Sequence, residues 1–380
     1  MKNKFLATLV AILFVGVGLV GGFGYYVFFY NAPTSDEYNP PKLKEEVVVN
    51  GDLEIHFMEL GNIYTGDSIY IKCGENDILV DAGSRRDSAT AIKNYVDQYC
   101  TDGTLEYVIA THADEDHISA FVSTQSRQGI FEYYAVETII DFPKSDKDTD
   151  IYAKYQEARD LEVSENGAVH YTALECYNNE GGAKRVIPLS EDVELEILYN
   201  YYYEHDSDDE NNYSVCFMIN QGSNHYLFTG DLEKEGEAKL VDFYKPLGGL
   251  PKCILYKAGH HGSGTSSSPA LMADIDPDYV VVCTCAGTSQ YTDNNDTQFP
   301  TQEMINNIAP YTDKIYVTTM VDNYVDKADW KSSGTVKSMN GNIVFKVVDG
   351  VESISCSNNN TILKDTDWFK EHRTWPPIAA

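Results

Sequence analysis

The sequence has little positive charge for its length. Its 380 residues include 28 Lys and Arg against 59 Asp and Glu, so the formal net charge is −31 at pH 7. A surface of this sign repels polyanions, and it disfavours an extended track for DNA or RNA unless a local basic patch exists.

Long uncharged apolar runs are also scarce, and the chain contains one, at its start. Residues 5–29 carry no charged side chain and are about long enough to cross a bilayer. Lys2 and Lys4 precede this run and acidic residues follow it, which favours a cytoplasmic N-terminus. We therefore predict a single-pass anchor helix over residues 1–30, uncleaved because Tyr and Phe crowd its distal end, with the remainder of the chain extracytoplasmic. A single span excludes a polytopic channel.

Cysteine is present at eight positions, without a spacing that indicates a metal or disulfide motif. Disulfides are compatible with an exported chain. Four of the cysteines lie in apolar, β-like runs where a buried free thiol fits equally well: Cys216, Cys253, Cys283 and Cys285.

The rest of the chain has the composition of an ordinary folded protein, 43% hydrophobic and 12% aromatic. Residues 31–46 contain prolines and charges without an apolar period, which predicts a linker. From residue 47 to 350, short strand-like runs alternate with helical segments in one continuous unit. We expect an α/β domain of two sheets packed face to face with outer helices, and a C-terminal extension over 351–380.

The most informative segment is THADEDH, at residues 111–117. It follows the apolar run LEYVIA and brings four potential ligands within six residues: His112, Asp114, Asp116 and His117. Their mutual repulsion is offset by a divalent cation, and imidazole with carboxylate suits zinc, while a carboxylate-rich set also admits manganese or iron.

Three other apolar runs also end in an acid or a histidine. LVDAG ends in Asp81, LFTGD ends in Asp231, and YKAGHHGS contains His260 and His261. A metal site assembled from strand ends needs this arrangement.

Taken in order, THADEDH, LFTGDLEKEGE and KAGHHGSGTSSS resemble the metallo-β-lactamase superfamily, in particular the soluble domain of ComEC-type DNA-internalisation proteins. FMELGNIYTGDSIYI, NNYSVCFMI and GTVKSMNGNIVFKV resemble further segments of that group, so the similarity covers roughly residues 53–348. It implies a metallo-β-lactamase αββα sandwich of two mixed sheets flanked by helices, here behind one transmembrane helix.

The resemblance also implies a ligand set for one or two ions, zinc or alternatively manganese. In that set Asp231 bridges the ions and Asp81 supports the metal loop from outside it. Of the histidine pair we prefer His261 as the ligand, with His260 facing the substrate, orienting a ligand or serving the structure alone. The implied metal ligands are His112, Asp114, Asp116, His117, Asp231 and His261.

The chain departs from the family pattern in two places. The second histidine of the usual HxHxDH is aspartate here, which is typical of the ComEC-like branch. No clear histidine precedes LFTGD for a further ligand, and His170 and His205 are candidates only by their order in the chain. The number of tightly held ions stays open between one and two.

The reaction we expect is metal-assisted hydrolysis of a phosphoester, in which a bound water loses its proton because the cation lowers its pKa. Asp116 and Asp231 orient this water, Lys257 places a positive charge near the substrate anion, and His260 completes the catalytic set. Two alternatives stay open: an accessory component of DNA uptake that works with a polytopic membrane partner, and a cell-surface enzyme similar to phosphorylcholine esterases.

Overall fold

The computed structural model describes residues 52–322 and 335–377, and their strands form two eight-stranded sheets. The first sheet has the order β16-β15-β1-β2-β3-β4-β5-β6, and the second has the order β14-β13-β12-β11-β10-β9-β8-β7. Both sheets combine parallel and antiparallel pairs, for example β3 with β4 and β2 with β3. The predicted two mixed sheets are therefore confirmed.

The strands of the first sheet are β1 (Leu53–Phe57), β2 (Ile69–Cys73), β3 (Asn76–Val80), β4 (Thr104–Ile109), β5 (Ala135–Asp141), β6 (Val169–Thr172), β15 (Ile343–Val348) and β16 (Val351–Cys356). The strands of the second are β7 (Val186–Pro188), β8 (Val193–Ile197), β9 (Phe217–Gln221), β10 (Asn224–Phe228), β11 (Leu255–Lys257), β12 (Tyr279–Ala286), β13 (Ile315–Val321) and β14 (Val336–Ser338).

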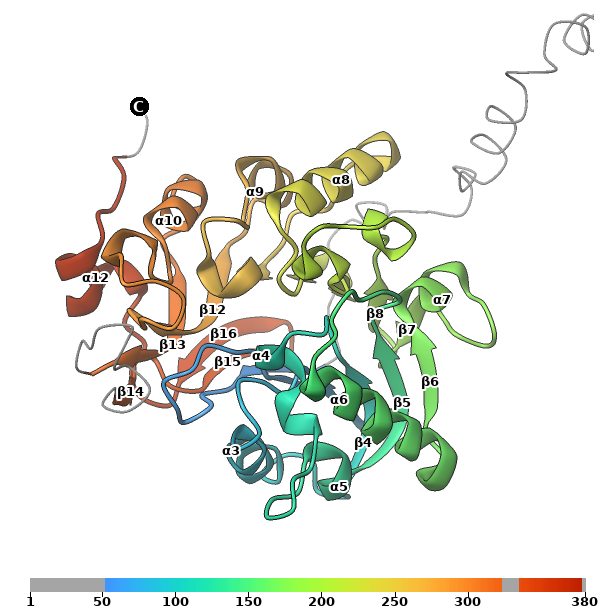
Figure 1. The fold of residues 1–380 in the computed structure, drawn as a ribbon. Coiled ribbons are helices and arrows are strands. Elements are labelled where there is room, and N and C mark those ends of the chain that lie inside the picture. Colours follow the sequence, from blue (N-terminus) through green and yellow to red (C-terminus); the bar gives the residue numbers. More distant parts are fainter. Residues whose placement is uncertain (1–51, 323–334, 378–380) are drawn as a thin grey trace, which may run out of the picture. The chain divides into compact units, whose positions relative to one another are not determined.

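The helices cover the outer faces of the two sheets (Figure 1). Those beside the first sheet are α3 (Ser88–Val96), α5 (Ile130–Tyr133) and α6 (Asp150–Leu161). Those beside the second are α8 (Lys234–Tyr244), α9 (Pro269–Ile275) and α10 (Gln302–Ile308). Strands covered on both faces must be apolar on both, and the burial of Ile78 to Val80 in β3 fits this rule.

The core between the sheets contains several aromatic rings. Phe57 of β1 lies 6.4 Å from Phe228 of β10 between ring centroids. Phe345 of β15 makes edge contacts with Tyr226 of β10 and Tyr279 of β12, at 5.6 and 5.4 Å. Because these pairs join one sheet to the other, they fix how the strand ends of the two sheets face each other.

The chain beyond residue 350 continues the first sheet, where the sequence suggested that the domain closes. Strand β16 pairs with β15 in antiparallel register from Val348↔Val351 to Ile343↔Cys356. The tail then forms helix α12 (Asp367–His372), in which Trp368 and Phe369 are buried. Arg373 donates hydrogen bonds to the carbonyls of Gln298 and Pro300, so the tail also supports that loop.

Residues 141–185 are an integral part of the first layer, because they supply α6, β6 and the short helix α7 (Ala173–Asn178). All eight cysteines are free thiols. Among the described residues, no helix is long and apolar enough to cross a membrane. The predicted anchor (1–30) and linker (31–46) lie outside those residues.

We predict that Trp368→Ala lowers the free energy of unfolding by about 3 kcal/mol, because it removes a buried ring from the packed tail. The exposed Lys370→Ala on the same helix is the control and should change stability by less than about 0.5 kcal/mol. The stability of both variants is measured by urea unfolding, followed by far-UV circular dichroism because tryptophan fluorescence would itself change in the Trp368 variant. Equal stability of the two variants would show that the tail is not part of the folded unit.

Candidate metal centre

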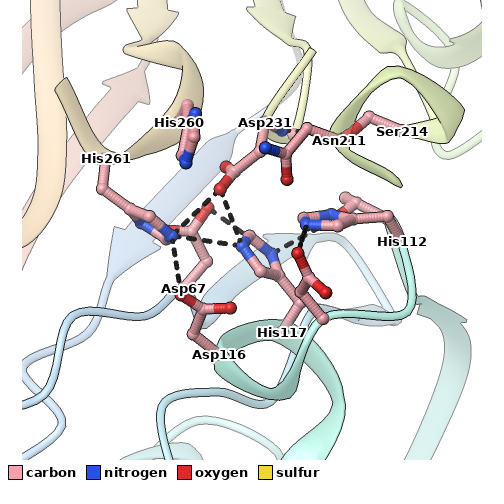
Figure 2. Close-up of polar contacts among 12 residues, drawn as sticks. Asp67, His112, Asp116, His117, Asn211, Ser214, Asp231, His260 and His261 are labelled. Carbon is pink, nitrogen blue, oxygen red and sulfur yellow. Dashed lines mark hydrogen bonds and ion pairs between the residues drawn. The ribbon is translucent and has the colours of Figure 1, made fainter. Parts of the chain in front are cut away.

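The polar strand ends identified in the sequence meet at one edge of the sandwich (Figure 2). Strand β4 leads into His112 and the short helix α4 (Glu115–Ile118), which carries Asp116 and His117. From the second sheet, β10 leads to Asp231, and β11 leads to the turn that contains His261. The two sheets therefore contribute opposite sides of one cluster.

Four atoms from these segments converge on one point. His117 Nε2 lies 3.2 Å from His261 Nε2. Asp231 Oδ2 lies 3.2 Å from the first of these nitrogens and 3.0 Å from the second. Asp116 Oδ2 is 3.5 Å from His261 Nε2. The histidines and Asp231 are at most 2% exposed, so solvent does not separate their charges.

The opposite nitrogen of each ring contacts its own carboxylate. His117 Nδ1 lies 2.8 Å from Asp81 Oδ2, and His261 Nδ1 lies 3.0 Å from Asp67 Oδ1. Such contacts place the ring hydrogen on Nδ1 and direct the lone pair of Nε2 towards the convergence point. Two lone pairs 3.2 Å apart repel each other unless a cation or a proton lies between them.

His112 supplies a second sign that these residues suit a metal. Its Nδ1 lies 3.1 Å from Thr111 Oγ1, whereas its buried Nε2 has no hydrogen-bond partner among the described residues. Its ring centroid is 4.1 Å from that of His117. An imidazole nitrogen that is buried without a partner costs free energy, and coordination to a metal offsets that cost. The donor set thus fits a divalent cation such as zinc.

The charge states follow from burial and from neighbours. Burial lowers the pKa of His112 well below its ordinary value, which leaves the neutral ring that metals bind. Burial also opposes a charge on His117, but Asp231 and Asp81 outweigh it and raise its pKa well above the usual range. Metal binding to His117 therefore displaces a proton.

Asp67 was not identified from the sequence, yet it belongs to the cluster. Together with His117, Asp231 and His261 it forms a group whose potential ligand atoms lie within 4.8 Å of one another. Asp67 faces the Nδ1 side of both rings, so we assign it to orienting His261 and not to the metal. A lone aspartate before strand β2 gives no signal by itself, because only the folded chain brings it beneath HHG.

The side chain of Lys257 is buried in the protein, whereas the sequence analysis expected it near a substrate anion. Its ammonium group is 1% exposed and forms an ion pair with Asp67. It also lies 3.4 Å from Asp231 Oδ1 and 3.3 Å from the carbonyl oxygen of Gly230. Lys257 therefore neutralises two buried carboxylates behind the cluster and does not face a substrate anion, which corrects the catalytic role expected for it.

Asp81 lies where support of the metal loop requires it. Its carboxylate accepts hydrogen bonds from the backbone N–H and the hydroxyl of Thr111, at 2.7 and 2.8 Å, besides its contact with His117. It is 1% exposed and has a positive φ of 58°. These bonds fix the start of THADEDH relative to strand β3.

The remaining acids of the motif line the outer side of the cluster. Asp114 Oδ2 is 3.8 Å from His112 Nε2, and its other oxygen pairs with Lys147. Asp116 accepts a hydrogen bond of 2.6 Å from the Tyr291 hydroxyl. Tyr291 lies on the loop between β12 and α10, so a residue far along the chain contacts the motif.

The adjacent histidines of HHG point in different directions. Both have positive φ, 46° for His260 and 54° for His261, and this tight turn separates their rings. His261 points into the cluster, whereas His260 lies 3.0 Å from Thr265 Oγ1 and 3.5 Å from Glu233 Oε1. The side chain of His260 is 20% exposed, which leaves it accessible from the site's entrance.

Neither histidine proposed by chain order for the further ligand reaches the cluster. His170 pairs with Asp141 at 2.7 Å on strand β6, and His205 stacks on Tyr201 at 3.9 Å between centroids. Figure 2 instead shows Asn211 beside Asp231, on the side of the cluster where His112 lies. The NNYS segment was noted in the sequence, but nothing there distinguished its asparagine as a site residue.

Comparisons with known proteins agree with this geometry. A model of the metallo-β-lactamase superfamily matches residues 61–186. ComE operon protein 3 of Bacillus subtilis is 24% identical over 181 residues, which are 47% of this chain and 20% of that protein. The chain is thus similar to the metallo-β-lactamase superfamily over residues 61–186, and to ComE operon protein 3 over just under half of its length.

Other similarities are shorter or more remote. Competence protein ComA of Neisseria gonorrhoeae is 38% identical over 73 residues, which are 19% of this chain and 10% of that protein. This chain thus spans a fifth or less of the length of both relatives. Among solved structures, the metallo-β-lactamase fold protein YhfI of Bacillus subtilis is 12% identical, with a TM-score of 0.42. The alignment covers 76% of this chain and 99% of the YhfI chain.

We predict that Lys257→Met lowers the free energy of unfolding of the metal-free protein by about 3–5 kcal/mol, because it leaves Asp67 and Asp231 buried without their cation. Lys252→Met is the matched control, since Lys252 is half exposed and pairs with surface acids. The double variant Lys257→Met, Asp67→Asn should regain part of the loss in urea unfolding. A loss no larger than that of Lys252→Met would contradict the role given to Lys257.

We also predict that Asp81→Asn weakens zinc binding by about 10–100-fold, because an amide presents an N–H group where Thr111 and His117 both donate. Competition with a chromogenic chelator measures the affinity, and Asp87→Asn, at an exposed position, is the control. Unchanged affinity in a folded Asp81 variant would mean that Asp81 does not orient a ligand.

Proposed function

We propose that this protein is a metal-dependent phosphoesterase. The observation that carries the proposal is the convergence of His117 Nε2, His261 Nε2 and Asp231 Oδ2 at 3.0–3.2 Å, with the unpartnered His112 Nε2 beside them. Carboxylate and imidazole in this arrangement suit zinc, and the carboxylates also suit manganese. One or two ions would fit the set, and Asp231 would be among the residues that hold them.

When bound, such a cation acidifies water and neutralises charge on a phosphoryl group. The chain's own residues supply the remaining functions. Asp116 and Asp231 accept hydrogen bonds from an attacking water and orient it. His260, which is partly exposed beside Thr265 and Glu233, is placed to pass a proton to the leaving oxygen. The Tyr291 hydroxyl donates its hydrogen to Asp116 and helps to hold that carboxylate in place.

A phosphodiester is the substrate class that we place first, because one relative is named a competence protein and the backbone of DNA is a phosphodiester. The net charge of −31 opposes a long DNA or RNA strand, so we place a short or small phosphodiester ahead of polymeric nucleic acid. An accessory role in DNA uptake, together with a polytopic membrane partner, is the alternative.

A hollow of about 480 Å³ beside His260 favours one further candidate. It is lined by the carboxylates of Glu233, Asp296 and Glu303 and by the ring of Phe299, and Lys234, which lines it too, pairs with Glu303. Acidic and aromatic groups together bind quaternary ammonium ions. A phosphorylcholine-type ester on the cell surface is therefore the second proposed substrate.

For location, we propose a single-pass membrane protein whose hydrolase domain lies outside the cytoplasm. The uncharged run over residues 5–29 and the lysines before it support this proposal.

The test is metal content together with hydrolysis of bis-p-nitrophenyl phosphate by the intact chain and by His117→Ala. We expect bound metal and turnover in the parent chain, and a loss of activity of at least about a hundredfold in the variant, because one ligand of the site is removed. His205→Ala, at an exposed position outside the cluster, should leave both unchanged. Stoichiometric metal without turnover of phosphodiesters would refute the phosphoesterase assignment, and absence of metal would refute the metal centre.

A further inference from the structure

The arginines of this acidic chain are unevenly distributed. The sequence contains six, and three of them line one groove of about 670 Å³: Arg85, Arg86 and Arg127. Asp114 of THADEDH lines the same groove, so its inner end reaches the metal centre. Four carboxylates line the groove as well, those of Asp87, Asp114, Glu115 and Asp150, so the guanidinium groups are the positive part of a lining of mixed charge.

These three arginines have only loose carboxylate partners. Arg85 lies 3.5 Å from Glu115, Arg86 lies 3.5 Å from Asp150, and Arg127 lies 3.8 Å from Asp87. The partner side chains are 51–76% exposed. Exposed ion pairs of this kind contribute little and can exchange for a better ligand.

Arg159 shows the contrasting arrangement. Its guanidinium donates at 2.8 Å to Asp141, which is 1% exposed, so this arginine is committed to the fold. Within the part of the chain that the structure describes, the ion pairs of the groove arginines all involve exposed carboxylates.

Arg85 also joins the groove to the metal centre. Its guanidinium lies 4.1 Å from the centroid of the Tyr64 ring, which holds it in place. It also lies 3.5 Å from Glu115, which stands between Asp114 and Asp116 in THADEDH. A ligand that contacts Arg85 therefore lies close to the entrance of the proposed catalytic site.

We infer that this groove binds a second phosphate group of the substrate, apart from the ester that is cleaved. Guanidinium groups match phosphate oxygens in paired hydrogen bonds, and they do so better than a lysine ammonium. The inference rests on the proposed function, and it narrows the substrate to a phosphodiester whose other half carries a further phosphate.

The first test is independent of catalysis and uses metal-free protein with inorganic pyrophosphate as the probe. Isothermal titration calorimetry should show saturable binding that weakens with salt. The double variant Arg86→Gln, Arg127→Gln should weaken it by about tenfold or more, because charge-assisted hydrogen bonds are lost. Lys370→Gln and Lys337→Gln together make the same charge change at exposed positions outside the groove and should leave binding unchanged. Equal binding by both double variants, or none by the parent chain, would overturn the inference.

The second test compares p-nitrophenyl phosphodiesters whose other ester group ends in a hydroxyl, a carboxylate or a phosphate. The Arg86, Arg127 double variant should raise KM for the phosphate-terminated ester by about tenfold and leave kcat and the hydroxyl-terminated ester unchanged. An equal rise for the carboxylate-terminated ester would overturn the assignment to phosphate. If the parent chain hydrolyses none of the three, the proposed function fails, while the pyrophosphate titration still decides the groove.

Discussion

The ion pair between Lys257 and Asp67, buried beneath the two histidines, is the contact on which the metal centre depends. Asp67, Asp81, Asp116 and Asp231 lie close together at the junction of two sheets, and all but Asp116 are almost inaccessible. Carboxylates brought together out of water destabilise a fold unless positive charge accompanies them. Lys257 supplies it from behind, and the histidines with a metal supply it from the front.

The same buried carboxylates also fix the orientation of the two imidazole rings. Asp81 holds Nδ1 of His117, and Asp67 holds Nδ1 of His261, so each ring is fixed by a carboxylate on one side and presents Nε2 on the other. The two rings come from different sheets. The aromatic contacts between the sheets, such as Phe57 with Phe228, therefore set the distance across which a metal is held. A change in the packing between the sheets would therefore also change the separation of the two histidines.

Much of this could be predicted from the sequence, for identifiable reasons. THADEDH, Asp231 and His261 were predicted as site residues because each directly follows an apolar strand, and the ends of such strands gather at one edge of a sheet. Asp67, Asn211 and Tyr291 could not be found in this way, since their place depends on long-range packing. The error for Lys257 has the same origin: the strand placed it near the site, but only the fold shows that its side chain points to Asp67. Strand β16 was missed because none of its side chains is fully buried, so it lacks the apolar run by which the other strands were found.

The most direct test of the account is an X-ray structure of the zinc-loaded protein with anomalous data at the zinc edge. The account predicts an anomalous peak about 2.0–2.2 Å from His117 Nε2, His261 Nε2 and an oxygen of Asp231, with Asp67 outside coordination distance. A peak bound by Asp67, or no peak among these side chains in a zinc-saturated crystal, would contradict the metal centre described for this chain.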